Sequence, residues 1–218
     1  DGDDGTSDLS NGGLRIMQPE SKKELDLTLD NFGASEKIEN ESIFIDIAGK
    51  GVERLDVTSI DISFINLENS GGKLASLNLV GAGVLGILQM PTSIETIDAR
   101  GSSADLTLST DALGATVLTD AGDDRITLTG GQATVETGDD DDVVYVLSGT
   151  NHDINTGGGN DTVDLLGGGN QVVMGTGTDK VIISGGTNTI ELGNGVGRAR
   201  IGGGTNVITS GDGADGIT

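Results

Sequence analysis

The chain has 218 residues, of which 38 are glycine, 35 are acidic and only 12 are basic, so its formal net charge is −23. With 2% aromatic residues and no cysteine, it lacks the residues for a core of large rings, for disulfides, for thiolate metal sites and for a cysteine nucleophile. Such charge repels nucleic acid and anionic membrane surfaces and attracts cations. No apolar stretch is long enough to span a bilayer, and no signal peptide opens the chain. We therefore expect neither nucleic-acid partners nor membrane insertion. The regularly spaced apolar residues, 34% of the total, argue against disorder.

Residues 1–41 form a polar, weakly patterned N-terminal segment. Within it, residues 25–29 alternate Leu-Asp-Leu-Thr-Leu, which predicts a strand with one buried face. Residues 1–13 suggest the end of a preceding acidic repeat. Since residues 215–218 stop inside a repeat, we expect both ends to be cuts in a longer protein.

Residues 42–117 contain short β-type runs divided by Gly, Ser and Asn. Comparable apolar positions are spaced by 22, 20 and 20 residues, namely Leu55, Leu77, Ile97 and Val117. This spacing predicts a parallel β-solenoid with slightly long turns and a structural role.

Residues 118–218 repeat every 18 residues, with one step of 19. Two apolar columns follow this period: Ile126, Val144, Val163, Val181, Ala199 and Ile217, and Val135, Ile154, Val172, Ile190 and Ile208. Each turn should therefore hold two short strands, one in each sheet, with a tight turn at either end. The β-branched residues and the absence of a 3.6-residue period exclude helix. We predict an all-β chain, a right-handed parallel β-solenoid that passes into an 18-residue-per-turn β-roll.

The two ends of each repeat differ. One end carries Asn170, Asn188 and Asn206 at intervals of 18, with Asn151 one turn earlier, and predicts a stacked amide ladder in preference to a second metal edge. The other end carries Gly-x-Gly-x-Asp turns. The acidic positions of these turns are Asp124, Asp142, Asp161, Asp179 and Asp215, and the column is broken at Gly197.

The acidic turns have the composition of calcium sites. Calcium takes six to eight oxygen ligands from carboxylates and backbone carbonyls, and stacked turns about 4.8 Å apart let one ion collect both kinds from two turns. Asp140 replaces the second glycine of its turn, so its carboxylate either joins the shell or stays in solvent. The alternative interpretation of the column is a solvated acidic face. The backbone candidates are Gly122, Gly138, Gly157, Gly159, Gly175, Gly177 and Gly213.

Residues 118–218 resemble the RTX family of calcium-binding repeats, whose nonapeptide is Gly-Gly-x-Gly-x-Asp-x-apolar-x. The stretch Thr156–Asp164 departs from this pattern only at its first residue, and residues 175–182 and 211–218 match comparably. The resemblance implies a parallel β-roll that holds about three to five Ca²⁺ ions. Asn in place of Gly-x-Asp at the second edge puts calcium there in doubt. Residues 93–98, followed by Gly101, are similar to β-solenoid portions of bacterial surface-layer (S-layer) proteins and type I-secreted adhesins.

The gap at Gly197 coincides with Arg198 and Arg200. One hypothesis is that either arginine supplies positive charge near Asp179 or Asp215 in place of an ion, and the alternative is that both point outward. The single histidine, His152, is interpreted as a solvated turn residue, and no Ser-His-Asp set or histidine cluster can be assembled. We therefore expect no enzymatic activity.

Taken with the resemblance, these patterns predict a structural calcium-binding segment of a secreted bacterial surface protein, an S-layer protein or adhesin, that folds and assembles on calcium binding. It would be extracellular or at the cell surface, exported by type I secretion, with calcium, other copies of itself and cell-surface polysaccharide as candidate partners. The alternative is a calcium-dependent accessory module of a secreted polysaccharide-modifying enzyme or protease.

Overall fold

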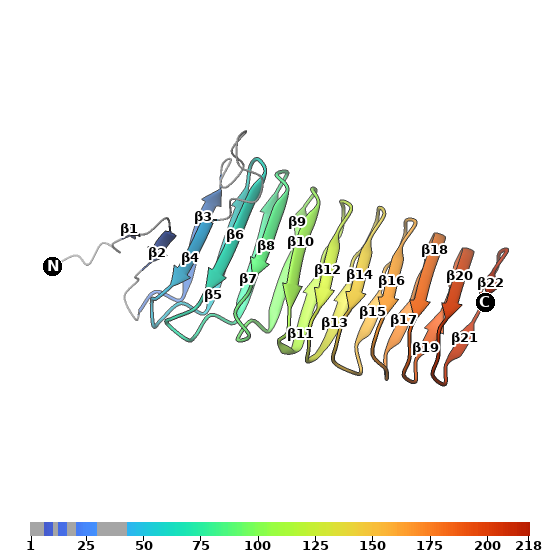
Figure 1. The fold of residues 1–218 in the computed structure, drawn as a ribbon. Coiled ribbons are helices and arrows are strands. Elements are labelled where there is room, and N and C mark those ends of the chain that lie inside the picture. Colours follow the sequence, from blue (N-terminus) through green and yellow to red (C-terminus); the bar gives the residue numbers. More distant parts are fainter. Residues whose placement is uncertain (1–6, 11–12, 17–20, 30–42) are drawn as a thin grey trace.

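The computed structural model describes residues 7–10, 13–16, 21–29 and 43–218, and every regular element in these ranges is a β-strand (Figure 1). Twelve strands form one sheet, in the order β1(Ser7–Ser10), β2(Gly13–Ile16), β4(Ile43–Ile47), β6(Ser63–Glu68), β8(Leu85–Gln89), β10(Leu106–Thr110), β12(Arg125–Leu128), β14(Val143–Val146), β16(Thr162–Leu165), β18(Thr176–Ile183), β20(Asn194–Ile201) and β22(Gly216–Ile217). Ten form the second, in the order β21(Val207–Thr209), β19(Thr189–Glu191), β17(Gln171–Val173), β15(Asp153–Asn155), β13(Gln132–Glu136), β11(Leu113–Leu118), β9(Thr96–Ser102), β7(Ser76–Gly81), β5(Arg54–Ser59) and β3(Glu24–Leu29).

The chain winds as a parallel β-solenoid, as the sequence predicts. From β3 onward it alternates between the two sheets, and each strand pairs in parallel with the strand one turn away, as in β12 with β14 and β13 with β15. The described residues make about 9 turns of about 19 residues each, stacked side by side along one axis (Figure 1). The pairing of β1 with β2 is antiparallel.

The strand registers confirm the apolar columns residue by residue. Ile126 pairs with Val144, Val144 with Val163, and Val163 with Val181, while in the other sheet Val135 pairs with Ile154. The looser spacing is also confirmed, because Leu55 pairs with Leu77 and Leu77 with Ile97. These residues are fully buried, since side chains alternate across a strand and every second one faces the space between the sheets.

One hydrophobic core fills the solenoid from Ile16 to Ala199 and continues across residue 117 without a break. The predicted strand at residues 25–29 is present as β3, with Leu25 and Leu29 buried. The hypothesis that residues 1–13 end a preceding repeat falls largely outside the described residues. Within the ranges described above, no helix is long and apolar enough to cross a membrane.

Candidate metal-binding edge

The Asp-bearing turns form one edge of the solenoid, where the chain passes from the ten-stranded to the twelve-stranded sheet. We call this edge, residues 119–124, 137–142, 156–161, 174–179, 192–197 and 210–215, the acidic edge. The opposite edge, where the chain returns to the ten-stranded sheet, carries the asparagines and is called the Asn edge.

Four aspartates of successive turns stack inside the acidic edge, and each is at most 2% exposed: Asp124, Asp142, Asp161 and Asp179. One carboxylate oxygen of each, Oδ1, accepts the backbone N–H one turn earlier. Asp124 N–H donates to Asp142 at 2.8 Å, Asp142 N–H donates to Asp161 at 2.9 Å, and the next bond in the series is 3.0 Å long. The first bond of the series, from Leu106 N–H to Asp124, extends it into the turn that precedes residue 118. The column is therefore built into the backbone pairing of the solenoid.

The second oxygen, Oδ2, of all four aspartates is buried and has no hydrogen-bond partner. Burial raises the pKa of Asp124 and of Asp161 to about 6 and that of Asp142 to about 7, and it also raises the pKa of Asp179. A threonine hydroxyl five residues earlier partly offsets this rise at three of them: Thr119 at Asp124, Thr137 at Asp142 and Thr156 at Asp161. A buried ionised oxygen without a partner is costly unless a cation or a proton compensates its charge. The column therefore has the chemistry of a cation site.

The donor set fits calcium in kind. Among the described residues no three His, Cys, Asp or Glu side chains converge as one metal-binding group, so an ion between two turns would have two column carboxylates and would need backbone oxygens as well. The carbonyls of Gly138, Gly157 and Gly175 lie in these turns, and each accepts one N–H from the next turn at 2.7–2.8 Å. A carbonyl oxygen has a second lone pair, so these groups retain acceptor capacity.

Two predicted glycines are required by close stacking of the turns. Gly159 and Gly177 have φ of 147° and 142°, and a Cβ on Gly177 would overlap the carbonyl oxygen of Gly159. Gly213 is a third predicted ligand position, and a Cβ there would overlap the carbonyl oxygen of Gly195 in the same way. These positions admit only glycine because the backbone of the adjacent turn occupies the space of a side chain.

Asp140 and Asp215 differ from the buried column. Asp140 is exposed at φ 77°, and its carboxylate accepts the N–H of Gly122 at 3.3 Å. Asp215 is partly exposed and accepts the N–H of Gly197 at 2.8 Å. Of the predicted ligands, the four buried aspartates are therefore alike, and these two lie in wetter surroundings.

A second column of carboxylates, which the Gly-x-Gly-x-Asp motif does not include, runs along the outside of the acidic edge. We call Asp105, Asp123 and Asp141 the outer carboxylate column; all three are exposed. Asp105 accepts the N–H of Asp123 at 3.0 Å, Asp123 accepts that of Asp141 at 3.1 Å, and Asn160 continues the series. The intervals of 18, 18 and 19 residues were a signal in the sequence.

Leu192 fills the break in the buried column at Gly197. A Cβ on Gly197 would lie 2.7 Å from Leu192 Cβ, and Leu192 stands where Thr119, Thr137 and Thr156 accompany their aspartates. Without a carboxylate at 197, β18 and β20 pair directly over eight residues, including Asp179 with Gly197. Arg198 and Arg200 are exposed, and neither forms an ion pair with Asp179 or Asp215, which agrees with the alternative that both point outward.

The Asn edge forms the predicted amide ladder. Asn188 Oδ1 accepts both the N–H and the Nδ2 of Asn170, at 3.2 and 3.1 Å, and Asn206 does the same for Asn188. Each Nδ2 also donates to the glycine carbonyl three residues earlier. Both polar groups of these amides are therefore satisfied by the protein itself.

The sequence prediction for His152 was wrong. His152 is 1% exposed and occupies the ladder position that the prediction had given to Asn151, which is exposed at φ 58°. Its Nδ1 accepts the N–H of Ala133 at 3.1 Å, and its own N–H donates to Asn170. Burial lowers the pKa of His152, which favours the neutral ring that this acceptor role requires.

Comparison of the chain with protein-family models, with curated proteins and with solved structures finds no match. The resemblance to calcium-binding repeats therefore rests on the motif and on the chemistry of the acidic edge.

Proposed function

We propose that the chain is a structural calcium-binding segment of a secreted bacterial surface protein, of the S-layer or adhesin type, that folds and assembles when it binds calcium. Its proposed location is extracellular or at the cell surface, after type I secretion. Asp124, Asp142, Asp161 and Asp179 supply carboxylates, and glycine carbonyls of the same turns complete each shell.

The observation that carries this proposal is the set of four consecutive buried Oδ2 atoms without partners. Stacking four ionised carboxylates in a dry column is unfavourable, and divalent ions between the turns offset that cost. Since Oδ1 of each aspartate already accepts a backbone N–H, metal binding and turn stacking involve the same side chains. Calcium binding is thereby coupled to folding.

Net charge supports the same coupling. Three calcium ions add six positive charges, which takes the chain from −23 to −17. Without metal, the repulsion among 35 acidic groups opposes the compact state. We infer that the chain stays loosely folded where calcium is scarce and becomes rigid where calcium is abundant.

The test is a calcium titration of the 218-residue chain at neutral pH, followed by circular dichroism, with magnesium as the control ion. We expect a transition to β structure with calcium and little response to magnesium, which dehydrates reluctantly and demands regular octahedral geometry. Full β structure in chelator, unchanged by calcium, would contradict the proposal.

The number of calcium ions bound by two variants tests whether the ions bind at the buried column. Asp142→Asn with Asp161→Asn keeps the Oδ1 acceptor and removes two charges, so it should lose calcium ions relative to the unmodified chain. The matched control is Asp153→Asn with Glu191→Gln, which removes two charges from exposed residues of the ten-stranded sheet. Equal stoichiometry in both variants would mean that the ions bind elsewhere.

A further inference from the structure

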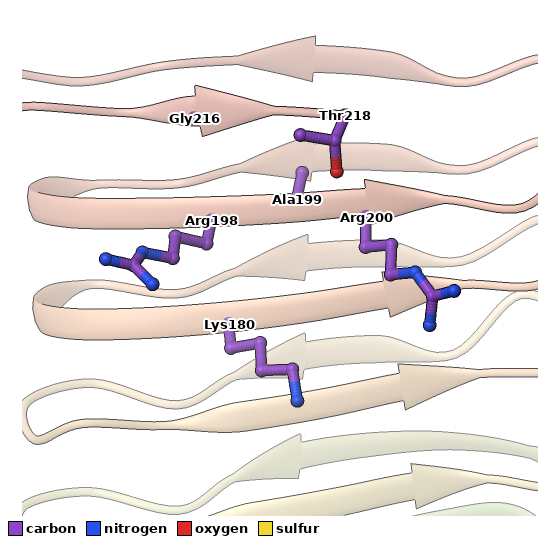
Figure 2. Close-up of a pocket in the computed structure, with 6 residues that line it drawn as sticks. All are labelled: Lys180, Arg198, Ala199, Arg200, Gly216 and Thr218. Carbon is purple, nitrogen blue, oxygen red and sulfur yellow. The ribbon is translucent and has the colours of Figure 1, made fainter.

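Three basic residues gather on the outer face of the twelve-stranded sheet, in a chain with few cations. Lys180 on β18 pairs directly with Arg198 on β20, and Arg200 follows two residues later on the same face. All three are exposed and, with Gly216 and Thr218, line a shallow hollow of about 520 Å³. Figure 2 shows Arg198 and Arg200 extending in opposite directions from β20, with Lys180 between them. We call Lys180, Arg198 and Arg200 the basic patch.

The basic residues of the patch form no ion pair with any described residue, and the carboxylate nearest to them in the strand register is Asp164, diagonal to Lys180 on the neighbouring strand. The ion pairs found among the described residues involve Arg15, Lys23, Arg54 and Arg100, all in the N-terminal half of the chain. Like charges that face each other across neighbouring strands repel. An external anion on this face would therefore be favoured.

The outer carboxylate column has the matching charge and the matching spacing. Asp105, Asp123 and Asp141 are held by N–H bonds from the following turn, so their positions are fixed before any contact forms. Successive carboxylates lie one turn apart, about 4.8 Å, and Lys180 and Arg198 lie one turn apart as well. Two solenoids placed side by side along a common axis direction would therefore bring several opposite charges into register at once.

We propose that the basic patch binds the outer carboxylate column of a second copy of the chain. This proposal rests on the proposed function, because it names the surface through which calcium-loaded copies assemble. The two surfaces are different parts of the molecule, so the contact is heterologous. Each copy then offers a free patch at one end and a free column toward the middle, which extends the assembly instead of closing a dimer.

Calcium and salt should act on this contact in opposite directions. Calcium in the buried column makes the net charge less negative, and so weakens the overall repulsion between copies. Added salt screens the exposed charges of the patch and of the column, since the Debye length falls to about 3 Å at 1 M salt. We therefore expect assembly in calcium at moderate ionic strength and dissociation at high ionic strength without loss of β structure.

The experiment is sedimentation velocity of the 218-residue chain in calcium over a concentration series. The unmodified chain should form species larger than one chain. Lys180→Glu, Arg198→Glu and Arg200→Glu together should weaken association by about 100-fold or more, since reversed charges at a contact repel. The charge-matched control, Lys22→Glu with Lys50→Glu and Lys73→Glu, alters exposed residues elsewhere and should weaken it far less.

A second variant separates the contact from net charge. Asp105→Asn, Asp123→Asn and Asp141→Asn keep the Oδ1 acceptor, as Asn160 does in the same column. This variant carries less negative charge, so general repulsion alone predicts stronger association, whereas the proposed contact predicts weaker association. The control Asp26→Asn with Asp61→Asn and Asp153→Asn changes net charge equally at exposed residues outside the column.

Circular dichroism in calcium distinguishes the possible failures. If the unmodified chain does not gain β structure, the proposed function itself is contradicted. If it folds but remains a single chain at every concentration, or if the patch variant assembles like the unmodified chain, only the proposed contact is contradicted. Binding of a soluble uronic-acid polysaccharide to the patch of a chain that remains single would also overturn it in favour of a glycan.

Discussion

Both edges of each turn use a side chain of nearly the same shape, Asp or Asn, to bond to the adjacent turn. Only on the Asn edge are all polar atoms of that side chain hydrogen-bonded within the protein. On both edges, a side-chain Oδ1 accepts the backbone N–H of the preceding turn, as in Asp142 with Asp124 and Asn188 with Asn170. On the Asn edge, the Nδ2 donates to a glycine carbonyl and to the next amide. On the acidic edge, the corresponding Oδ2 is buried without a partner.

This difference assigns the dependence of turn stacking on a cation to the acidic edge. Replacing NH₂ by O⁻ turns a donor into a charged acceptor, so the neighbouring carbonyls can no longer satisfy it. The Asn edge therefore holds adjacent turns together without a cation. The acidic edge does so only when a cation or a proton compensates its charge.

The largest expected effect is the pH dependence of the metal-free protein. The pKa values of Asp124, Asp142 and Asp161 are raised to about 6, 7 and 6, above the unfolded value of about 3.9. Their contribution to stability is therefore fully present below about pH 3.9 and is lost as pH rises through 6 to 7. The loss is on the order of 3 kcal/mol for each carboxyl, since one pKa unit corresponds to about 1.4 kcal/mol.

Circular dichroism in chelator between pH 4.5 and 7.5, with urea unfolding at each pH at which the chain is folded, measures this slope. The Asp142→Asn, Asp161→Asn variant should show a shallower slope than the unmodified chain, because two of the titrating groups are gone. A metal-free stability that is flat or rises with pH over this range would remove the distinction between the two edges.

Next in size is the loss of one amide from the Asn edge. Asn188→Ala leaves the N–H of Asn170 and the carbonyl of Gly185 without a side-chain partner, and leaves Nδ2 of Asn170 with the carbonyl of Gly167 alone. We expect a loss of roughly 2–4 kcal/mol, because unsatisfied buried polar groups cost about 1–3 kcal/mol each and relaxation recovers part of it. The loss should be equal in calcium and in chelator, provided that both states are folded, and Thr187→Ala at the exposed turn should change stability little. A calcium-dependent loss at Asn188 would show that the edges are coupled.

A smaller effect is expected where the acidic column is interrupted. Gly197→Asp places a side chain against Leu192, 2.7 Å from its Cβ, and should destabilise the protein by about 1–3 kcal/mol through overpacking. Leu192→Thr in the same chain restores the composition of the turns at Asp124, Asp142 and Asp161. The double variant should regain stability in calcium and bind additional calcium, as measured by isothermal titration calorimetry. Unchanged calcium binding would mean that Thr and Asp together do not suffice to extend the column.

The smallest effect concerns His152 on the Asn edge. Burial lowers its pKa, so its contribution to stability is present above the unfolded value of about 6.5 and is lost as pH falls through the lowered folded value. In calcium, the unmodified chain should lose more stability than His152→Asn between pH 7 and pH 5. The asparagine supplies the same acceptor to Ala133 without a titrating ring. Identical acid sensitivity in the two chains would contradict the structural role of the neutral ring.

Much of the fold could be predicted because the repeat determines the register. Once residues 126, 144, 163 and 181 are aligned, every second residue must face the core, and the strand pairing follows. The Asn ladder followed from the same period. His152 was missed, although it lies 18 residues before Asn170, because it is a different residue type from the rest of its column.

The burial and hydrogen bonding of the individual carboxylate oxygens could not be predicted from the sequence. The pattern placed Asp142 and Asp161 one turn apart, but it did not show that each Oδ1 accepts a backbone N–H and leaves Oδ2 buried. Likewise, Asp123 and Asp124 are neighbours of the same type, and only the structure shows one exposed and the other 2% exposed. Burial of single oxygens depends on packing between turns, which the period alone does not specify.

The most direct test of the difference between the edges compares Asp142→Asn, Asp161→Asn with the unmodified chain at pH 7, by the free energy of unfolding in calcium and by the β structure that circular dichroism detects in chelator. We predict opposite effects in the two conditions. The variant should be less stable than the unmodified chain in calcium, because it has lost ligands, and should retain more β structure in chelator, because it no longer buries two unpaired charges. A variant that is less stable in calcium and no more folded in chelator would contradict a cation-dependent acidic edge.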